Sequence, residues 1–163
     1  LGQWNIGEGE LRLKVGGGVD TRLGFLYNMR NSNNPAQAYG QVNIAPNAVA
    51  AYRFRLRNLP FQLRYEVQVP LLGLAFSPNY GQSYYEIFTR DNYDHNLVVT
   101  SPVSAPSLRQ QLTLDFTVRH TTFRVGYLRD YQQAKINQLR QHVWSNLLVL
   151  GIVRKFSINK FIP

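Results

Sequence analysis

The chain has 163 residues and no cysteine, and it carries a formal net charge of +9, with arginine supplying most of its 18 basic residues. The lack of cysteine excludes disulfide bonds and thiolate metal sites, and the arginine excess favours paired or partly buried cations over a solvated basic tail. The longest apolar run, residues 147–153, is far shorter than the roughly 20 residues of a transmembrane helix, so any membrane span must be built from strands.

The first predicted element is a long strand over residues 9–27. Apolar residues recur there at every second position, and the period continues through the glycines at residues 16–18. This continuity predicts one strand with a glycine kink, and a tight turn at the glycines is the alternative. The next segment, residues 28–46, is rich in Asn, Gly and Pro and predicts a long loop.

A β-hairpin is predicted over residues 51–69. Aromatic and aliphatic residues alternate strictly with arginines and glutamines on both sides of a break at residues 58–60. One face of the hairpin is therefore apolar and the other is charged. A soluble sandwich would bury the apolar face, whereas an outer-membrane barrel would turn it to lipid and the charged face to its lumen.

The centre of the chain gives weaker signals. Residues 70–76 extend the second strand of the hairpin, and short strands are predicted at residues 84–88 and 96–100. A proline-rich loop follows at residues 101–107. No helical segment is predicted.

A second hairpin of the same kind is predicted over residues 112–127, with its turn near His120 and Thr121. A polar loop over residues 132–141 then leads to a last strand over residues 143–156. The total is about eight strands joined by alternating short turns and long loops, which is typical of outer-membrane barrels. We therefore expect an all-β fold, an antiparallel transmembrane β-barrel, forming a single domain over residues 1–163.

Charged residues on one face of these strands form the main candidate site. A narrow barrel must pair or solvate such groups, so we expect an Arg/Glu/Asp network that closes the lumen and holds the strands in register. The expected members of this network are Arg53, Arg55, Arg57, Arg64, Glu66, Asp115, Arg119 and Arg124.

Aromatic residues gather near the strand ends and on the apolar faces. In a membrane barrel they would face lipid and form interfacial girdles. The expected members are Tyr27, Tyr52, Phe54, Phe61, Tyr65, Phe116, Phe123, Tyr127, Trp144 and Phe156.

The sequence predicts no catalytic site, metal site or cofactor. The histidines, His95, His120 and His142, are far apart in sequence and show no metal-ligand spacing. The nearest pair that resembles an activated nucleophile, His142 and Ser145, has opposite strand parity. Nucleic-acid binding is not expected, because strand alternation separates the arginines from the aromatic rings that bases would stack on.

Several stretches of the sequence carry a family resemblance. They are residues 23–38 (LGFLYNMRNSNNPAQA), 50–65 (AAYRFRLRNLPFQLRY), 76–88 (FSPNYGQSYYEIF), 92–96 (NYDHN), 105–116 (APSLRQQLTLDF) and 123–137 (FRVGYLRDYQQAKIN). These stretches resemble DUF3316, an uncharacterised family of Bacteroidota outer-membrane β-barrel proteins. The resemblance implies further strands upstream, so that the chain corresponds to the C-terminal part of a larger barrel.

Together these features predict a non-enzymatic integral protein of a Gram-negative outer membrane, a structural or accessory component of an envelope complex. Its expected partners are outer-membrane lipid and lipopolysaccharide, and other envelope proteins bound through extracellular loops. Two alternatives stay open: a small anion-conducting pore, suggested by the arginine excess, and a soluble lipocalin-like barrel with its apolar face inward.

Overall fold

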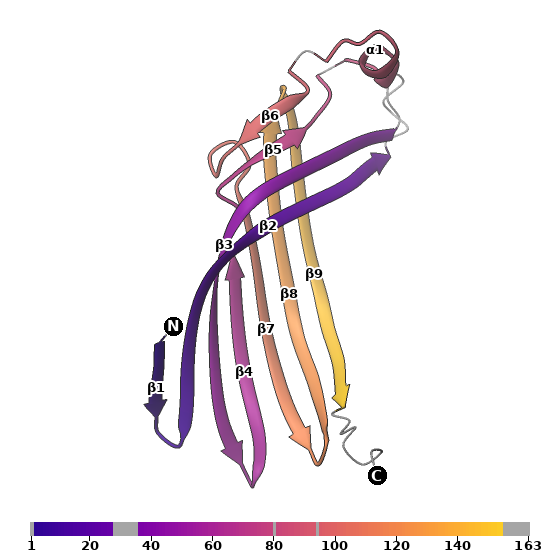
Figure 1. The fold of residues 1–163 in the computed structure, drawn as a ribbon. Coiled ribbons are helices and arrows are strands. Elements are labelled where there is room, and N and C mark those ends of the chain that lie inside the picture. Colours follow the sequence, from indigo (N-terminus) through magenta and orange to yellow (C-terminus); the bar gives the residue numbers. More distant parts are fainter. Residues whose placement is uncertain (1, 28–35, 80, 94, 155–163) are drawn as a thin grey trace, which may run out of the picture.

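A computed structural model describes residues 2–27, 36–79, 81–93 and 95–154 (Figure 1). These residues form one 9-stranded sheet and one helix of six residues. All the strand pairs are antiparallel, which confirms the all-β antiparallel fold expected from the sequence. No helix in the described part of the chain is long and apolar enough to cross a membrane.

The elements follow one another along the chain with short connections. They are β1 (Gly2–Ile6), β2 (Gly9–Tyr27), β3 (Ala36–Leu56), β4 (Leu59–Gln68), β5 (Leu72–Phe76), α1 (Tyr84–Thr89), β6 (Leu97–Thr100), β7 (Ser107–Val118), β8 (Thr121–Ile136) and β9 (Leu139–Arg154). The sheet order is β1-β2-β3-β4-β7-β8-β9, and β5 and β6 branch from the upper part of β3. We call the end with the β1–β2, β3–β4 and β7–β8 turns the turn end, and the end with α1 the helix end (Figure 1).

The predicted long strand is confirmed: β2 runs for 19 residues through the three consecutive glycines. Beyond them β2 and β3 bend together, and their upper halves cross in front of β7 and β8 (Figure 1). Both predicted hairpins are confirmed as β3–β4 and β7–β8. The first turn consists of Arg57 and Asn58, whose φ angles are 49° and 66°, so it lies slightly earlier than expected.

The prediction of a loop over residues 28–46 is wrong for residues 36–46, which belong to β3. Residues 28–35 lie outside the described residues, but β3 begins at Ala36 and pairs with β2 from Tyr27↔Ala36 onward. The reason is that the long upper edge of β2 needs a partner for its backbone groups, and this need outweighs the low strand propensity of Asn, Gly and Pro.

The strand expected at residues 84–88 is also wrong, because this segment is α1. Ser83 is the N-cap: its side chain accepts a hydrogen bond from the Glu86 backbone N–H at 3.2 Å, and the Glu86 carboxylate accepts one from the Ser83 N–H at 3.0 Å. This capping box is the S-x-x-E signature, a helix signal that the period-two interpretation overlooked.

Three further differences concern the strand count and the last hairpin. Residues 132–136 belong to β8 and residues 139–141 to β9, so the expected polar loop is only a turn at Asn137 and Gln138, whose φ angles are 50° and 64°. The segment expected to extend the second strand is instead the separate strand β5, paired with β3. With β1, which was not predicted, the sheet has nine strands rather than about eight.

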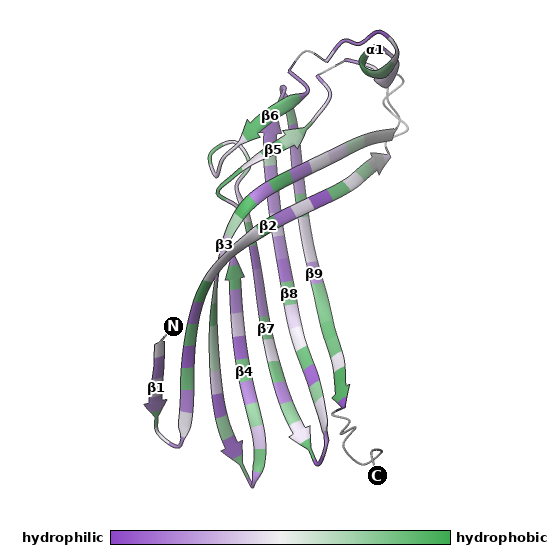
Figure 2. Ribbon diagram, viewed as in Figure 1, coloured by the Kyte–Doolittle hydropathy of each residue, from purple (hydrophilic) through white to green (hydrophobic). Residues whose placement is uncertain are grey.

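The two faces of the sheet differ in chemistry, as Figure 2 shows by the alternating colours along each strand. We call the side that carries Leu11, Tyr52, Leu63, Leu114 and Val125 the apolar face; these residues are cross-strand neighbours in one continuous row. We call the other side the polar face. Its matching row is Glu10, Arg53, Gln62, Asp115 and Arg124.

Burial is inverted relative to a water-soluble protein. Large apolar side chains are exposed, including Leu23 at 81%, Phe25 at 76% and Leu150 at 73%. The buried apolar residues of the described chain are few and mostly small, while Asp20, Asn43, Thr100, Thr113 and Asp115 are buried polar residues. The buried strand residues therefore lie on the polar face, and the sheet of the described residues does not close on itself.

Candidate functional site

The polar face is concave, and a cluster around Arg22 at the helix end shows this directly. The Arg22 guanidinium donates a hydrogen bond to the Ser107 hydroxyl at 3.3 Å and lies 3.9 Å from a carboxylate oxygen of Asp130. These residues belong to β2, β7 and β8, and β2 is not a sheet neighbour of either other strand. Their side chains can meet only because the sheet curls around its polar face.

The same cluster holds a second carboxylate. Arg22 Nε lies 2.7 Å from Asp20 Oδ2, and both side chains are only 9% exposed. Asp130 also accepts a hydrogen bond from Gln132 at 3.0 Å. Sequence reasoning did not include this cluster in the expected network, although Asp20 and Arg22 share the parity of the charged residues nearer the turn end.

Part of the expected charge network is present on the polar face. Arg124 on β8 donates two hydrogen bonds to Asp115 on β7, at 2.7 and 2.6 Å, which is a bidentate pair across the hairpin. Arg64 and Glu66, two residues apart on β4, form a second pair at 2.7 Å. Arg12 pairs with Glu10 in the same manner on β2.

The other expected members are not joined by ion pairs among the described residues. Arg53 donates to the Gln62 amide oxygen at 2.8 Å. Arg55 is exposed and lies opposite Pro60 in the β3–β4 register. Arg57 and Arg119 lie in the tight turns with φ angles of 49° and 55°, so neither occupies a strand position.

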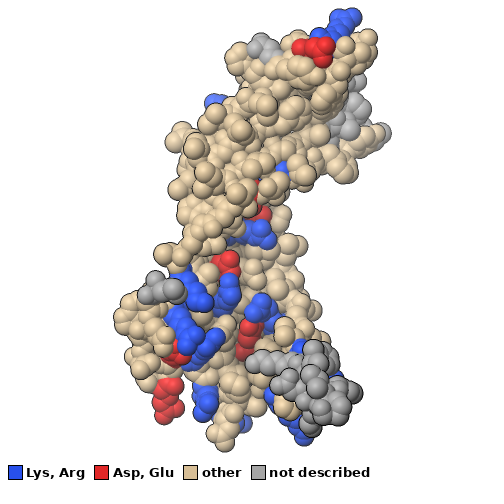
Figure 3. All heavy atoms as spheres, viewed as in Figure 1, with Lys and Arg blue, Asp and Glu red and all other residues tan. Residues whose placement is uncertain are grey.

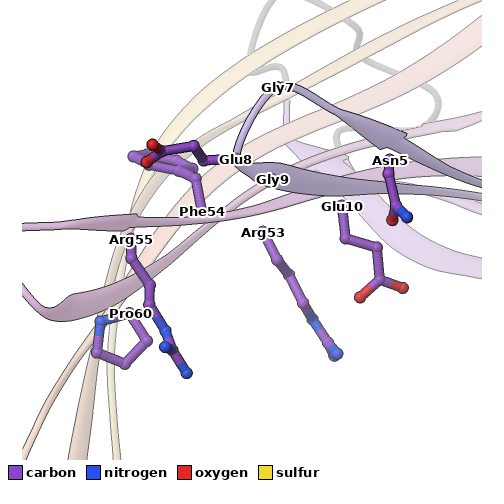
Figure 4. A pocket seen from close by; sticks show the side chains of 9 residues that line it. All are labelled: Asn5, Gly7, Glu8, Gly9, Glu10, Arg53, Phe54, Arg55 and Pro60. Atoms are coloured by element: carbon purple, nitrogen blue, oxygen red, sulfur yellow. The ribbon is translucent and has the colours of Figure 1, made fainter.

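Arg53 and Arg55 line a cavity of about 560 Å³ at the turn end. Its other lining residues are Asn5, Gly7, Glu8, Gly9, Glu10, Phe54 and Pro60. In Figure 4 the side chains of Arg53, Arg55 and Glu10 project to the same side of the sheet, whereas that of Glu8 points away. Figure 3 shows the charged residues gathered over the half of the molecule nearer the turn end.

The apolar face carries a continuous row of aromatic rings close to the turn end. Ring centroids are 5.5 Å apart for Phe54 and Phe61, 6.1 Å for Phe61 and Phe116, and 5.4 Å for Phe116 and Phe123. Tyr52 stacks on Phe54 at 5.5 Å and extends the row along β3. The row therefore crosses β3, β4, β7 and β8.

The other expected aromatic residues lie nearer the helix end. Trp144 packs edge-on against Tyr131 at 5.5 Å, with the Arg129 guanidinium 5.3 Å from its ring centroid. Tyr65 donates a hydrogen bond to Gln110 at 2.8 Å, and Tyr127 donates one to Asn146 at 2.6 Å. Tyr27 is exposed at the end of β2, and Phe156 lies outside the described residues.

The histidines do not come together in the structure. His95 lies between α1 and β6, His120 lies in the β7–β8 turn, and His142 lies on β9, three positions from Ser145 and therefore on the opposite face of that strand. Within the described ranges no group of three or more His, Cys, Asp or Glu residues is placed to hold a metal ion.

Comparison with known proteins gives one match. The searches of curated proteins and of solved structures each find no match to the chain. A family model described as "Protein of unknown function (DUF3316)" matches residues 1–161, which is nearly the whole chain. The chain therefore belongs to the DUF3316 family.

Proposed function

We propose that this protein is a non-enzymatic integral β-barrel protein of a Gram-negative outer membrane, in Bacteroidota as the family resemblance implies. The observation that carries the proposal is the inverted burial: the large side chains of the apolar face are exposed, and the buried strand residues lie on the polar face. Exposing side chains such as Leu23 and Leu150 to water costs roughly 25 cal/mol per Å² of apolar surface. Lipid removes this cost, and outer-membrane barrels are built with this polarity.

Aromatic side chains at two levels of the apolar face also support a lipid-facing orientation of that face. Phe123 and Tyr131 both lie on the apolar side of β8 and are eight positions apart, which corresponds to about 26 Å along the strand. For a strand tilt of about 40°, this gives about 20 Å along the membrane normal, close to the roughly 25 Å apolar band of outer-membrane barrels. The phenylalanine row and the Tyr131–Trp144 pair would then mark the two interfaces.

We assign the protein a structural or accessory role in an envelope complex. The insertion between β5 and β6 supports this role, because it is folded and presents aromatic groups at the helix end. Asn96 donates to Gln82 at 2.7 Å and Gln82 donates to the Asn92 carbonyl at 2.9 Å, which fixes the insertion. Tyr85 and Phe88 are 61% and 60% exposed on it. Aromatic side chains of this kind are common in contacts between proteins.

The test is expression of the full-length protein with an export signal, followed by fractionation and by SDS electrophoresis of heated and unheated samples. We expect folded protein in the outer membrane, resistant to alkaline carbonate extraction, with a mobility that changes on heating. Recovery of folded protein from the periplasm without detergent would contradict the proposal.

An anion pathway is the second candidate, and one observation favours it. Arg53 and Arg55 face the concave side without a carboxylate partner among the described residues, and uncompensated arginines attract anions. The experiment is a planar-bilayer recording, in which a chloride-selective conductance would support the pathway and an intact barrel without conductance would reject it.

The lipocalin-like alternative requires the apolar face to be enclosed, and the inverted burial favours the membrane proposal over it.

A further inference from the structure

Two neighbouring arginines on the polar face are left without acidic partners by the ion pairs around them. On the half of this face nearer the turn end, Glu10 pairs with Arg12, Glu66 with Arg64 and Asp115 with Arg124. Arg53 and Arg55 have no ion pair in the part of the chain that the structure describes. These three carboxylates are therefore already neutralised, and the positive charges of Arg53 and Arg55 are left side by side.

The local geometry keeps both guanidinium groups available. Arg53 uses its Nε–H to hold the Gln62 amide oxygen at 2.8 Å, which orients the guanidinium and leaves its terminal amino groups free of hydrogen bonds to described residues. Arg55 lies opposite Pro60 in the β3–β4 register, and the proline ring has no polar atom to compete for it. Because the two arginines are two positions apart on β3, they project from the same face.

The space in front of these arginines is large enough for a ligand. The cavity of about 560 Å³ has Gly7 and Gly9 in its wall, so the β1–β2 turn adds little side-chain bulk. Glu8 lines it as well, but its side chain points away from both arginines (Figure 4). Arginine forks bind the oxygens of phosphate and carboxylate groups in bidentate geometry, and phosphate offers enough oxygens for two such groups.

We propose that Arg53 and Arg55 form a binding site for a phosphate-type oxyanion on the concave face at the turn end. The source is either inorganic phosphate or the phosphate of a lipid headgroup that reaches the rim of the lumen, because Arg55 lies only two positions before the β3–β4 turn residue Arg57 and the proposed function takes the aromatic row at this level as a membrane interface. This proposal rests on the proposed function, because the concave face lines a lumen only if the protein is a membrane barrel.

The test uses the full-length protein refolded in a zwitterionic detergent and titrated with inorganic phosphate by calorimetry. A second arm adds phosphatidylglycerol to the micelles and records phosphorus NMR line broadening. We expect Arg53→Gln/Arg55→Gln to weaken phosphate binding by about tenfold or more, because two charge-assisted contacts are lost. The control, matched to the single variant Arg55→Gln, is Arg90→Gln, which removes one exposed arginine at the helix end and should leave the affinity within about twofold.

Each possible result either supports the phosphate site or overturns it. Phosphate binding that is lost in the double variant and kept in the control supports the site, and line broadening with the same variant dependence assigns the lipid headgroup as a source. Equal affinity in all variants, or no binding to the unaltered chain, overturns the proposal. If the double variant does not fold, Arg55→Gln alone gives the test, because that side chain is exposed and has no ion pair among the described residues. A separate measurement tests the proposed function itself: folding of the unaltered protein without detergent would contradict the membrane barrel, whatever the phosphate titration shows.

Discussion

The bidentate Asp115–Arg124 pair joins β7 to β8 through two side-chain hydrogen bonds. Arg124→Met would leave Asp115, which is 9% exposed, without its cation. We expect a loss of about 1–3 kcal/mol in the free energy of unfolding, at the lower end of what a broken buried pair costs because the Arg124 side chain is itself 38% exposed. Urea titration of the refolded chain in micelles measures it.

The matched control replaces both partners. Asp115→Leu/Arg124→Met removes the unpaired charge together with the pair, so its stability should return most of the way to that of the unaltered chain. A double variant as unstable as Arg124→Met alone would show that the pair stabilises the hairpin through its attraction and not by avoiding a buried unpaired carboxylate.

Neighbouring residues on β7 test the two faces separately. Leu112 lies on the apolar face between Tyr65 and Tyr127, and Gln111 lies on the polar face opposite Glu66. Leu112→Arg should destabilise the membrane-inserted state by about 2–4 kcal/mol, the cost of a cation near the middle of the bilayer. Gln111→Arg adds the same charge beside a carboxylate and should cost much less. Equilibrium refolding into liposomes compares them, and the reverse ranking would mean that the sheet faces lipid with its other side.

At the scale of elements, Arg22 links the upper half of β2 to β7 and β8 through Ser107 and Asp130. Arg22→Met should release the upper halves of β2 and β3, because it leaves Asp20 and Asp130 facing each other without the cation between them. We expect faster amide hydrogen exchange in the upper parts of β2 and β3 and unchanged exchange near the β7–β8 turn. Arg12→Met, on the same strand near the turn end, is the control and should leave the upper halves protected.

Period-two alternation was enough to predict the elements whose partners are close in sequence. In the β3–β4 and β7–β8 hairpins both strands alternate and a tight turn separates them, so sequence alone assigned their two faces. The first part of β3 and the end of β8 could not be found in this way. Their polar, Asn- and Gln-containing segments are strands because long neighbours need hydrogen-bonding partners, which depends on the assembled sheet.

In the candidate site, too, the contacts within one hairpin were predictable from the sequence and the contacts between distant strands were not. Asp115–Arg124 was predictable, since both residues belong to one hairpin and share a face. The contact of Arg22 with Ser107 and Asp130 was not, because it joins strands that are far apart in the sheet and exists only through curvature. Likewise, the sequence showed an arginine excess, but which arginines lack a carboxylate follows from the side-chain pairing.

At the scale of the whole molecule, a lipid-embedded sheet must satisfy the backbone groups of its edges. In the described residues the two ends of the main strand order are β1 and β9, and β6 is a further edge on the β5–β6 branch. Every step along the sheet between β1 and β9 is antiparallel, so both strands run in the same direction, toward the turn end (Figure 1). Direct closure would therefore make a parallel pair, whereas antiparallel closure needs an odd number of further strands between them.

Cysteine crosslinking distinguishes these closures, and the chain has no native cysteine to interfere. We expect no disulfide between Asn5→Cys on β1 and single cysteines placed along the polar face of β9, at Val143, Ser145, Leu147 and Val149. Disulfides form only when the Cα atoms are within about 7 Å. Efficient crosslinking at any of these pairs would show that β1 and β9 close directly.

The central claim is that the apolar face meets lipid and the polar face does not. The most direct measurement is quenching of a fluorophore on single cysteines by nitroxide-labelled lipids after refolding into liposomes. We predict strong quenching at Leu112→Cys and Leu148→Cys on the apolar face and little at Gln111→Cys and Ser145→Cys on the polar face. Equal quenching on both faces, or stronger quenching at the second pair, would contradict the account.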